Sequence, residues 1–309
     1  MGAFIFRHLE FCWRGVRPTS WPALPAALVL LVACAPSARE TAARIRGVDD
    51  AGDTVTLAAP ARRVVSLIPA STELLFAIGA GDLVQGRTRW CDYPAAAAAV
   101  PDLGDGIQPS LEAILARQPD LVVLYRSPQN TAVREALGRL GVPVVQLSID
   151  RLADFERASH LLGTLTGHEA GADSMLAVFH AQLDSATTPP AGSGPSVLIL
   201  VWDQPPMTVG SGSYLSEIVT RAGGRNLFAD IAASSATVSV ESVVDRNPDV
   251  VLVTSEDTPA FARRAEWQTV PAVRERRFVR VIGSAFSRPS PRTPDAILEL
   301  RRELASVRR

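Results

Sequence analysis

Short runs of apolar and β-branched residues recur along the chain, separated by stretches with helical spacing. Six such runs occupy residues 64–68, 121–124, 142–147, 197–201, 250–253 and 278–282. They are apolar without strict alternation, which is typical of strands buried on both faces of a parallel sheet. Because helical stretches lie between them, the pattern predicts βα units and an α/β fold with mostly parallel sheets.

One helix–turn–strand pattern occurs twice. Residues 111–124 match residues 240–253 at a constant offset of 129, and each copy carries a Pro-Asp pair before its strand. A looser match relates residues 73–80 to residues 217–224. An internal repeat of this kind indicates two lobes of similar build, each formed around one apolar sheet, with a ligand cleft between them.

The stretch between the two lobes has apolar residues at the spacing of helix faces. Gly167 is expected to divide it into two helices, and Asp150 and Asp154 are the expected caps at its start. The second helix is predicted over residues 169–184, about 24 Å at 1.5 Å per residue. A long, rigid helix between two lobes permits only small opening and closing of the cleft.

The first 33 residues have the pattern of an export signal. Three arginines precede an apolar stretch at 22–33, whose 12 residues are fewer than the roughly 20 that a membrane span needs. The run Leu-Val-Ala-Cys at 31–34 resembles the bacterial lipobox, which implies a diacylated Cys34 at the mature N-terminus. The alternative is a buried cysteine after a plain signal peptide. Residues 35–46 are small and polar, as expected of a tether.

These patterns divide the chain into a lipoprotein signal peptide, a lipidated cysteine with its tether, an N-terminal lobe, an interlobe backbone helix and a C-terminal lobe. The corresponding ranges are 1–33, 34–46, 47–166, 167–187 and 188–309. Removing the signal takes away three Arg and one Glu, so the formal charge of −1 becomes about −3. That weakly acidic balance, without a basic run, gives no electrostatic footprint for nucleic acid.

Enzyme and metal chemistry find little support in the residue patterns. The loop 210–214 lacks the third glycine of a dinucleotide fingerprint and is expected to be a turn before a helix. His160, His168 and His180 all fall in the interlobe stretch, away from the strand ends where a metal receptor needs its ligands. Cys91 has no cysteine partner once Cys34 is lipidated, so we expect a small buried group and no disulfide. The prediction is therefore no catalytic residue, no metal ligand and no cofactor beyond the ligand.

Three motifs in order carry a family resemblance. They are Arg-Val-Val-Ser-Leu-Ile-Pro-Ala-Ser-Thr-Glu-Leu-Leu at 63–75, Cys-Asp-Tyr-Pro at 91–94, and Leu111-Glu112 followed by Pro-Asp-Leu-Val at 119–122. Together they resemble the substrate-binding proteins of ABC importers whose lobes are joined by a helical backbone. That group serves cobalamin, haem and ferric siderophores. Arg288 followed by Ser-Pro-Arg at 290–292 is similar to the cobalamin-binding branch.

The ligand of such a protein is expected at the carboxyl ends of the strands, where loops meet in open α/β sheets. The resemblance implies that Trp90, Tyr125 and Trp202 are aromatic contacts and that Arg288 is a polar contact to the ligand's rim. A further short strand is expected after the run at 64–68, and both Trp90 and Tyr93 follow it, so Tyr93 is expected in the site with Trp90. Trp and Tyr suit a large, flat, amphipathic ligand, because they offer apolar area with a polar tip.

Two departures from the cobalamin-binding branch make the expected site less aromatic. Residues 104–107 and 232–236 lack the tryptophans that precede the two docking glutamates in that branch. A ferric siderophore is often anionic, so Arg89, Arg126 and Arg292 would favour that ligand instead. A tyrosine ligand for haem iron also stays open.

Glu112 and Glu241 occupy equivalent positions in the repeat. The resemblance implies that they are exposed, one per lobe, and dock onto arginines of the permease. The alternative is a helix-start acid favoured by the helix dipole, with Ser110 and Ser239 as caps.

The sequence as a whole predicts a monomeric, non-enzymatic lipoprotein, exported and anchored at the membrane surface. It would capture cobalamin or a related corrinoid, or another metal chelate, and deliver it to an ABC permease. A ferric-siderophore or haem binder of the same fold is the first alternative. An enzyme or cofactor scaffold on a two-lobe fold is the alternative from another class; a cysteine-ligated cluster fails because Cys91 stands alone in the body.

Overall fold

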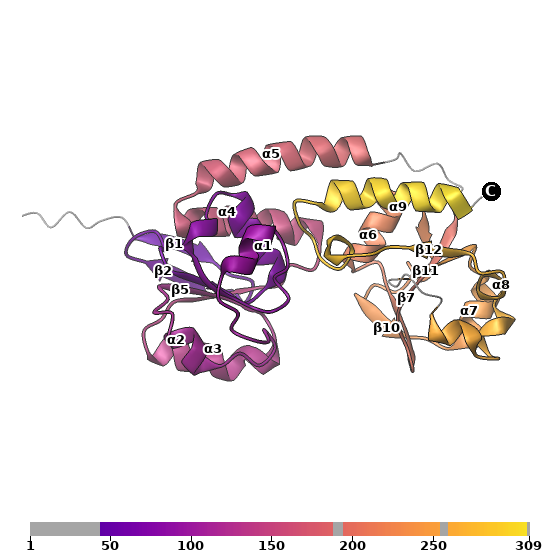
Figure 1. The fold of residues 1–309 in the computed structure, drawn as a ribbon, viewed down its shortest axis with the longest axis horizontal. Helices are drawn as coiled ribbons and strands as arrows, with labels where there is room; N and C mark the ends of the chain where they lie inside the picture. The colour runs from indigo at the N-terminus through magenta and orange to yellow at the C-terminus, as the bar shows by residue number, and fades with distance from the viewer. Residues whose placement is uncertain (1–43, 188–193, 254–258, 308–309) are drawn as a thin grey trace, which may run out of the picture. The chain divides into compact units, whose positions relative to one another are not determined.

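The computed structural model describes residues 44–187, 194–253 and 259–307 (Figure 1). Cys34, the signal segment and most of the tether lie outside these ranges, so the lipobox stays a prediction. Residues 42–309 form one compact unit that contains two α/β lobes. The exact lobe boundaries at residues 166 and 187 also stay predictions. Within the described ranges, no helix is both long and apolar enough to cross a bilayer.

The N-terminal lobe is built on a fully parallel sheet. Its strands lie in the order β4 (Val84–Arg87), β3 (Val64–Ser66), β5 (Leu121–Tyr125) and β6 (Val144–Leu147). Alternate residues of β5 enter two different hydrophobic clusters, which explains why the strand is apolar at both of its faces. The first predicted run continues two residues beyond β3, because the following helix begins at Pro69.

Helices cover both faces of this sheet. One face packs on α1 (Pro69–Ala77) and α4 (Leu152–Thr166), and the other packs on α2 (Leu111–Leu115) and α3 (Thr131–Arg139). Three short 3-10 turns complete the connections, at Gly81–Leu83, Ala95–Ala99 and Pro128–Asn130. An antiparallel hairpin that the sequence analysis did not predict, β1 (Ile45–Val48) with β2 (Thr54–Leu57), packs on α4.

The C-terminal lobe has a mixed sheet. Its parallel part consists of β9 (Arg225–Asn226), β7 (Ser196–Asp203), β11 (Val250–Val253) and β12 (Phe278–Arg280). Two antiparallel strands, β8 (Pro206–Val209) and β10 (Ser235–Thr237), extend it beyond β7. The prediction of mostly parallel sheets is confirmed, with this antiparallel edge as an addition.

The helices of the C-terminal lobe repeat the same layering. One face carries α6 (Tyr214–Arg221) and α9 (Thr293–Val307), and the other carries α7 (Val240–Arg246) and α8 (Pro271–Arg274). Short 3-10 turns lie at Ala260–Arg263, Trp267–Thr269 and Ser284–Phe286. The loop 210–214 is a turn before α6, as predicted.

The two copies of the repeat, residues 111–124 and 240–253, form matching helices, turns and strands. Helices α2 and α7 begin at equivalent positions, as do strands β5 and β11. In the turn between helix and strand, Gln118 and Asn247 are also equivalent, and both adopt a left-handed backbone, with φ of 49° and 43°. The repeat therefore extends to an unusual backbone conformation that neither residue type alone would specify.

The aspartate of each Pro-Asp pair anchors the start of the neighbouring strand. The carboxylate of Asp120 accepts hydrogen bonds from the backbone N–H groups of Arg62 and Arg63, at 2.8 and 2.9 Å, just before β3. Asp249 accepts hydrogen bonds from the backbone N–H and the hydroxyl of Ser196, at 2.7 and 2.8 Å, at the start of β7. These bonds tie the starts of the two central strands together in both lobes.

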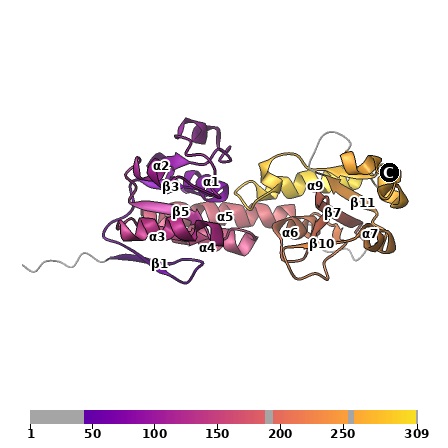
Figure 2. The same ribbon diagram turned by 90° about the horizontal axis from the view of Figure 1, so that it is seen from below.

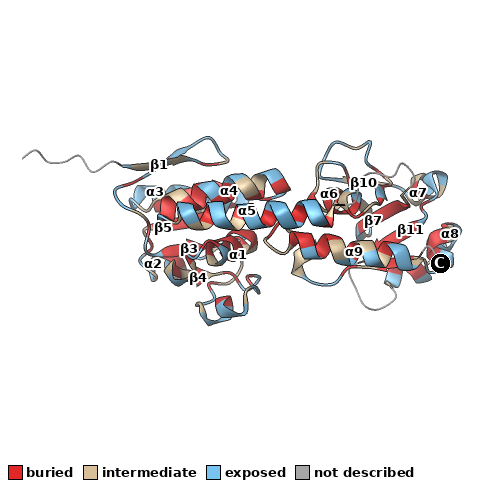
Figure 3. Ribbon diagram, turned by 90° about the horizontal axis from the view of Figure 1, so that it is seen from above, coloured by how far each residue is buried: buried red, intermediate tan, exposed pale blue. Residues whose placement is uncertain are grey.

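Helix α5 (Glu169–Ala186) is the predicted connection and ends two residues later than expected. Gly167, with φ of 71°, ends α4 as predicted. The buried side chains of α5 follow a spacing of three and four, so one stripe faces inward (Figure 3); they are Ala172, Leu176, Phe179, Leu183 and Ala186. This helix contacts α4 and α1 of the N-terminal lobe and α9 of the C-terminal lobe, as Figures 1 and 2 show.

The predicted caps of α4 are wrong. Its N-cap is Arg151, which makes no side-chain cap bond. Asp154, in the first turn, accepts a hydrogen bond from the backbone N–H of Asp150 at 3.2 Å. The backbone N–H of Leu152 donates to the carboxylate of Glu217, at 3.0 Å, so a side chain of the other lobe satisfies the helix start.

Candidate ligand-binding site

The four predicted aromatic contacts share one property. Trp90, Tyr93, Tyr125 and Trp202 have 59%, 42%, 36% and 60% of their surface exposed. In the part of the chain that the structure describes, these are the aromatic residues among the exposed large hydrophobic side chains. Single exposed hydrophobic residues are common on protein surfaces, so the importance of these four for a ligand depends on where they lie.

All four lie at or beyond the carboxyl end of a strand. Trp90 and Tyr93 lie in the loop after β4, and Tyr125 is the last residue of β5. Trp202 differs slightly from the prediction, because β7 continues through Asp203 and Trp202 is therefore within the strand. Both lobes thus present aromatic side chains at the edge where ligands bind in parallel sheets.

An ion-pair cluster joins the two lobes beside Tyr93. Glu73 of α1 is fully buried, and its Oε1 accepts hydrogen bonds from Arg288 Nε at 2.9 Å and from Arg292 Nη2 at 2.7 Å. Arg292 Nε donates to Glu73 Oε2 at 3.0 Å, which makes that pair bidentate. Arg288 also donates to Asp92, and the guanidinium of Arg292 lies 4.1 Å from the centre of the Tyr93 ring.

The cluster is electrically balanced, since two guanidinium groups face two carboxylates. Partial burial opposes the ionisation of Asp92, but the hydrogen bond and charge of Arg288 outweigh it and hold the pKa of that carboxyl below its usual value. Asp92 therefore carries its negative charge at neutral pH. Arg288 belongs to this cluster, and part of its donor capacity is already used within the protein; its contact with a ligand stays a prediction.

Tyr125 is held by a carboxylate. Its hydroxyl donates to Asp150, at 3.0 and 2.9 Å from the two oxygens. Burial, with this hydrogen bond and the negative charge of Asp150, raises the pKa of Tyr125 to about 12. Burial also raises the pKa of Asp150, partly offset by the hydrogen bond from Tyr125. The ring is therefore fixed in place as a neutral phenol.

A hollow of about 230 Å³ lies next to this pair and is formed by both lobes. The N-terminal lobe contributes Tyr125, Ile149 and Asp150, and the C-terminal lobe contributes a larger set: Ser213, Tyr214, Leu215, Ser234, Ser287 and Pro289. Ser287 and Pro289 flank Arg288 in the chain. The structure thus brings Tyr125 and the loop of Arg288 to one cavity, and the ion-pair cluster links that loop to Tyr93.

Trp202 lines a separate hollow of about 290 Å³ at the end of the C-terminal sheet. Val253, Pro259 and Phe261 are among its other walls. The indole N–H of Trp202 donates to the carbonyl of Gln204 at 2.8 Å, which orients the ring while leaving its face exposed. The structure therefore places Trp202 at the predicted edge but not in the same hollow as Tyr125. Trp90 lies in the loop beside Cys91 and Asp92.

The two predicted docking glutamates are exposed, each in the first turn of a helix. Ser110 caps α2 through Ala113 N–H at 3.3 Å, and Ser239 caps α7 through Ser242 N–H at 3.2 Å, as predicted. The pKa of the Glu241 carboxyl is lowered by a hydrogen bond from its own backbone N–H and, to a smaller extent, by one from the hydroxyl of Ser239. Glu112 and Glu241 are thus presented alike in the two lobes.

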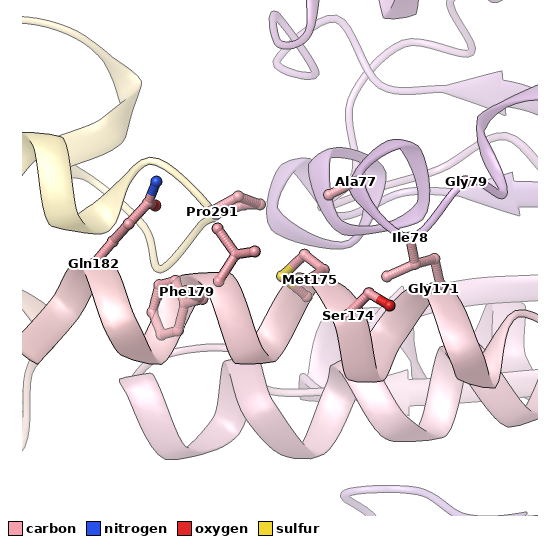
Figure 4. A pocket seen from close by; sticks show the side chains of 10 residues that line it. Ala77, Ile78, Gly79, Gly171, Ser174, Met175, Phe179, Gln182 and Pro291 are labelled. Carbon is pink, nitrogen blue, oxygen red and sulfur yellow. The ribbon is translucent and has the colours of Figure 1, made fainter.

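A further groove of about 470 Å³ lies along α5, away from the strand ends. Figure 4 shows it between α5, the end of α1 and Pro291. Its walls are apolar except for Ser174 and Gln182, and none of its lining residues is charged. It does not include any of the predicted ligand contacts, so the candidate site stays at the strand ends.

The histidines and Cys91 lie away from the candidate contacts or have partners within the protein. His160 and His180 lie on the outer surfaces of α4 and α5, where they face Asp173 and Glu156. Cys91 is 1% exposed, and its Sγ lies 3.1 Å from the hydroxyl of Thr72. Over the described ranges, no three His, Cys, Asp or Glu side chains are arranged to hold a metal ion.

Sequence reasoning missed the role of Glu73. It lies in a helix whose neighbouring residues, from Ala70 to Leu75, are all buried. A carboxylate on a buried helix face needs compensating charge, because an unpaired buried charge costs several kcal/mol. That single acid among buried residues was the available signal. Its partners could not be read from it, since they lie more than 200 residues along the chain.

Curated relatives resemble the chain over most of its length. The vitamin B12-binding protein of Vibrio parahaemolyticus is 28% identical over 253 residues, covering 81% of this chain and 92% of that protein. The vitamin B12-binding protein of Yersinia pestis (strain Pestoides F) is 29% identical over 250 residues, covering 80% of this chain and 88% of that protein.

Solved structures share the fold. The periplasmic vitamin B12 binding protein BtuF of Vibrio cholerae matches with a TM-score of 0.60 at 24% identity, over 81% of this chain and 99% of that one. The periplasmic heme-binding protein RhuT from Roseiflexus sp. RS-1 matches with a TM-score of 0.70 at 24% identity, over 80% of this chain and 99% of that one. At these identities the likeness shows the two-lobe architecture.

A family model described as periplasmic binding protein matches residues 64–283. The match begins at β3, covers the repeat and α5, and ends just after β12, so it includes the frame of both lobes. This chain belongs to the periplasmic binding protein family.

Proposed function

We propose that this protein is the substrate-binding component of an ABC importer that captures cobalamin or a related corrinoid. The observation that carries the proposal is the set of exposed aromatic side chains at the strand ends of both lobes. The curated relatives named vitamin B12-binding proteins support the choice of ligand.

The chemistry of the site suits a large, flat ligand with polar substituents. Exposed aromatic rings provide apolar area at a small cost in conformational entropy, and fixed polar groups orient the ligand. Tyr125 and Trp202 are each oriented by a hydrogen bond, so their rings are preorganised before a ligand arrives. The site contributes binding and orientation, and its proposed role is not enzymatic.

Delivery to a permease is the second part of the proposal. Glu112 and Glu241 each stand exposed at the start of a repeat helix, one on each lobe. Two carboxylates on separate lobes suit a permease with paired basic sites, where charge complementarity speeds encounter and fixes orientation. The proposal takes the binding protein as a monomer that meets its permease outside the inner membrane.

A lipid anchor at Cys34 would hold the protein near that permease. The Leu-Val-Ala-Cys run supports the anchor, and the family supports an extracytoplasmic location. Mass spectrometry of the purified exported protein tests the anchor directly. A diacylated N-terminal Cys34 is the expected result, and an unmodified cleaved N-terminus would contradict it.

Haem is the second candidate ligand, because Tyr93 and Tyr125 are exposed in the site. A tyrosine that ligates haem iron does so as a phenolate. The pKa of Tyr125 is raised to about 12, and the ring of Tyr93 lies against a guanidinium. The first of these effects opposes formation of a phenolate at Tyr125, and the corrinoid is therefore the better-supported ligand.

Calorimetric titration of the full exported protein, purified in detergent, tests the function. The ligands are cyanocobalamin, cobinamide, haemin and a ferric siderophore. We expect the two corrinoids to bind, and Trp90→Ala and Trp202→Ala each to weaken binding by about tenfold, the loss expected for one buried aromatic contact. Leu140→Ala is the matched control, because Leu140 is 58% exposed at the end of α3 and away from the strand ends. Tight haemin or siderophore binding without corrinoid binding would refute the ligand, and no binding at all would refute the role.

A further inference from the structure

The charges of the side chains at the strand-end site affect which ligands the site can bind. Arginine stays protonated at any physiological pH, so a largely buried guanidinium needs a counter-charge from the protein or from the ligand. In this site the protein itself supplies the counter-charge. Glu73 and Asp92 face Arg288 and Arg292, and the loop that carries Arg288 borders the hollow beside Tyr125.

We propose that Glu73 is a specificity-determining residue, which makes the site accept an uncharged, amide-bearing ligand and reject an anionic chelate. The inference rests on the proposed function in one respect, namely that the ligand binds at the strand ends. It adds a reason for the ligand's charge that the aromatic contacts do not provide.

Burial makes Glu73 an effective counter-charge. Its side chain is fully buried, so neither water nor salt screens its pairing with the two arginines. Arg292 binds both carboxylate oxygens of Glu73, and Arg288 shares its charge between Glu73 and Asp92. An incoming anion would have to displace a buried carboxylate or lie close to it, and both are unfavourable.

The arginines nevertheless keep hydrogen-bonding capacity for a neutral ligand. The bonds that Arg288 and Arg292 make to the described residues use Nε and Nη2 of each guanidinium. A guanidinium has five N–H donors, so the Nη1 groups stay available to an acceptor. An amide carbonyl, which accepts a hydrogen bond without bringing charge, fits that requirement.

Other arginines near the strand ends follow the same pattern. Arg264 pairs with Asp203 beside Trp202, and Arg151 pairs with Glu217. Arg126 lies close enough to Asp150 to favour its ionised form. Of the three arginines expected to favour an anionic siderophore, Arg292 is ion-paired with Glu73, whereas the Nε of Arg126 donates to the hydroxyl of Ser148 at 3.3 Å. Arg89 is exposed in the loop after β4, with no ion pair to the described residues.

The test compares neutral and anionic probes on charge-neutralising variants. Glu73→Gln and Asp92→Asn each remove one carboxylate from the cluster with little change of shape. Asp53→Asn is the matched control, because it removes one negative charge beside Arg134 on the β1–β2 hairpin side of the lobe. The probes are cyanocobalamin, which is uncharged, and ferric enterobactin, which is trianionic. Each titration is carried out at low and at high salt.

We expect wild-type protein to bind ferric enterobactin weakly, and Glu73→Gln and Asp92→Asn to bind it about tenfold more tightly at low salt. The increase should shrink at high salt, because the anionic probe approaches the cluster from solvent, on the side where Asp92 is 57% exposed. Cyanocobalamin affinity should change by less than about threefold, since its contacts do not depend on net charge. A role of Glu73 in stability alone would not produce a change that depends on ligand charge and salt.

Two results would overturn the inference. One is unchanged ferric enterobactin affinity in both cluster variants. The other is an equal increase in Asp53→Asn, which would assign the effect to overall charge. Asp92 is 57% exposed, so Asp92→Asn tests the inference even where Glu73→Gln fails to fold. Wild-type protein that fails to bind cyanocobalamin would refute the proposed ligand, whereas a charge-dependent increase in the variants would still support the role of Glu73.

Discussion

The two lobes have a similar arrangement of strands and helices but differ in the ion pairs that each makes with the other lobe. Glu73 of α1 and Glu217 of α6 lie at corresponding positions in the looser repeat. Each copy ends at a glycine with a left-handed backbone, Gly79 with φ of 86° and Gly223 with φ of 90°. Each glutamate forms ion pairs with the opposite lobe. Glu73 binds Arg288 and Arg292, and Glu217 binds Arg151.

The environments of the two glutamates differ. Glu73 is fully buried and its two arginines are 14% and 21% exposed, whereas Glu217 is 19% exposed and Arg151 is 50% exposed. Similar topology therefore produces one ion-pair cluster around a fully buried glutamate and one ion pair whose glutamate is partly exposed. The repeat gives the two glutamates corresponding positions in the fold, but the loops at the strand ends determine which residues surround each of them.

The largest expected difference between the lobes is in stability. Glu73→Ala leaves two arginines without their buried partner, and we expect a loss of about 3–5 kcal/mol in the free energy of unfolding. Glu217→Ala breaks a more exposed pair and leaves the N–H of Leu152 without its acceptor, so we expect about 1–2 kcal/mol. Urea unfolding of both variants measures this. Equal losses would mean that burial does not distinguish the two pairs.

The docking surface is where the lobes should behave alike. Glu112→Arg and Glu241→Arg are each expected to reduce ligand uptake by about tenfold through charge repulsion at the permease. Ligand affinity of the isolated protein should not change, because both residues are exposed and neither lines the hollows of Tyr125 and Trp202. Uptake by cells and calorimetry separate the two quantities. A loss of affinity in either variant would show that the residue is not a docking residue.

The aromatic residues of the two lobes should differ in their response to pH. Tyr125 has its pKa raised from 10.0 to about 12, whereas Trp202 is held by a backbone carbonyl that does not titrate. Since the folded-state pKa is the higher one, the stability from Tyr125 is fully present below pH 10 and is lost as pH rises through 12. Difference titration of phenolate absorbance between wild type and Tyr125→Phe should show ionisation well above pH 10. Ionisation at the ordinary value would refute the pairing with Asp150.

The smallest expected effect concerns the left-handed turns. Gln118 adopts φ of 49° in one lobe and Asn247 adopts φ of 43° in the other, and Asn tolerates this conformation better. Gln118→Gly should therefore stabilise the protein by about 0.5 kcal/mol, and Asn247→Gly should be close to neutral. Thermal or urea unfolding measures the stability of both variants, and a larger stabilisation by Asn247→Gly than by Gln118→Gly would contradict this prediction.

Local features were predictable from the sequence. The strand at Val250–Val253, the break at Gly167 and the caps at Ser110 and Ser239 follow from short-range patterns, and the structure confirms them. The exposed aromatic residues were located by their place after the predicted strands, and their contact with a ligand stays a prediction.

Features that depend on distant parts of the chain were not predictable. The edge strands β8 and β10 are short and partly polar, so the pairing of β8 with β7 and of β10 with β8 has no periodic signal. Asp150 was expected to cap α4, but its side chain accepts a hydrogen bond from Tyr125, which comes from a neighbouring strand. Arg288 was identified as polar and near the ligand, whereas its pairing with Glu73 depends on how two lobes meet.

Helix α5 has a consequence for how the molecule unfolds. Its 18 residues, about 27 Å of helix, contribute buried side chains to a hydrophobic cluster that includes strands from both sheets. Neither lobe can lose that cluster without exposing apolar surface of the other. Calorimetric melting should therefore show one cooperative transition for the whole unit. The helix therefore makes the stability of each lobe depend on the stability of the other.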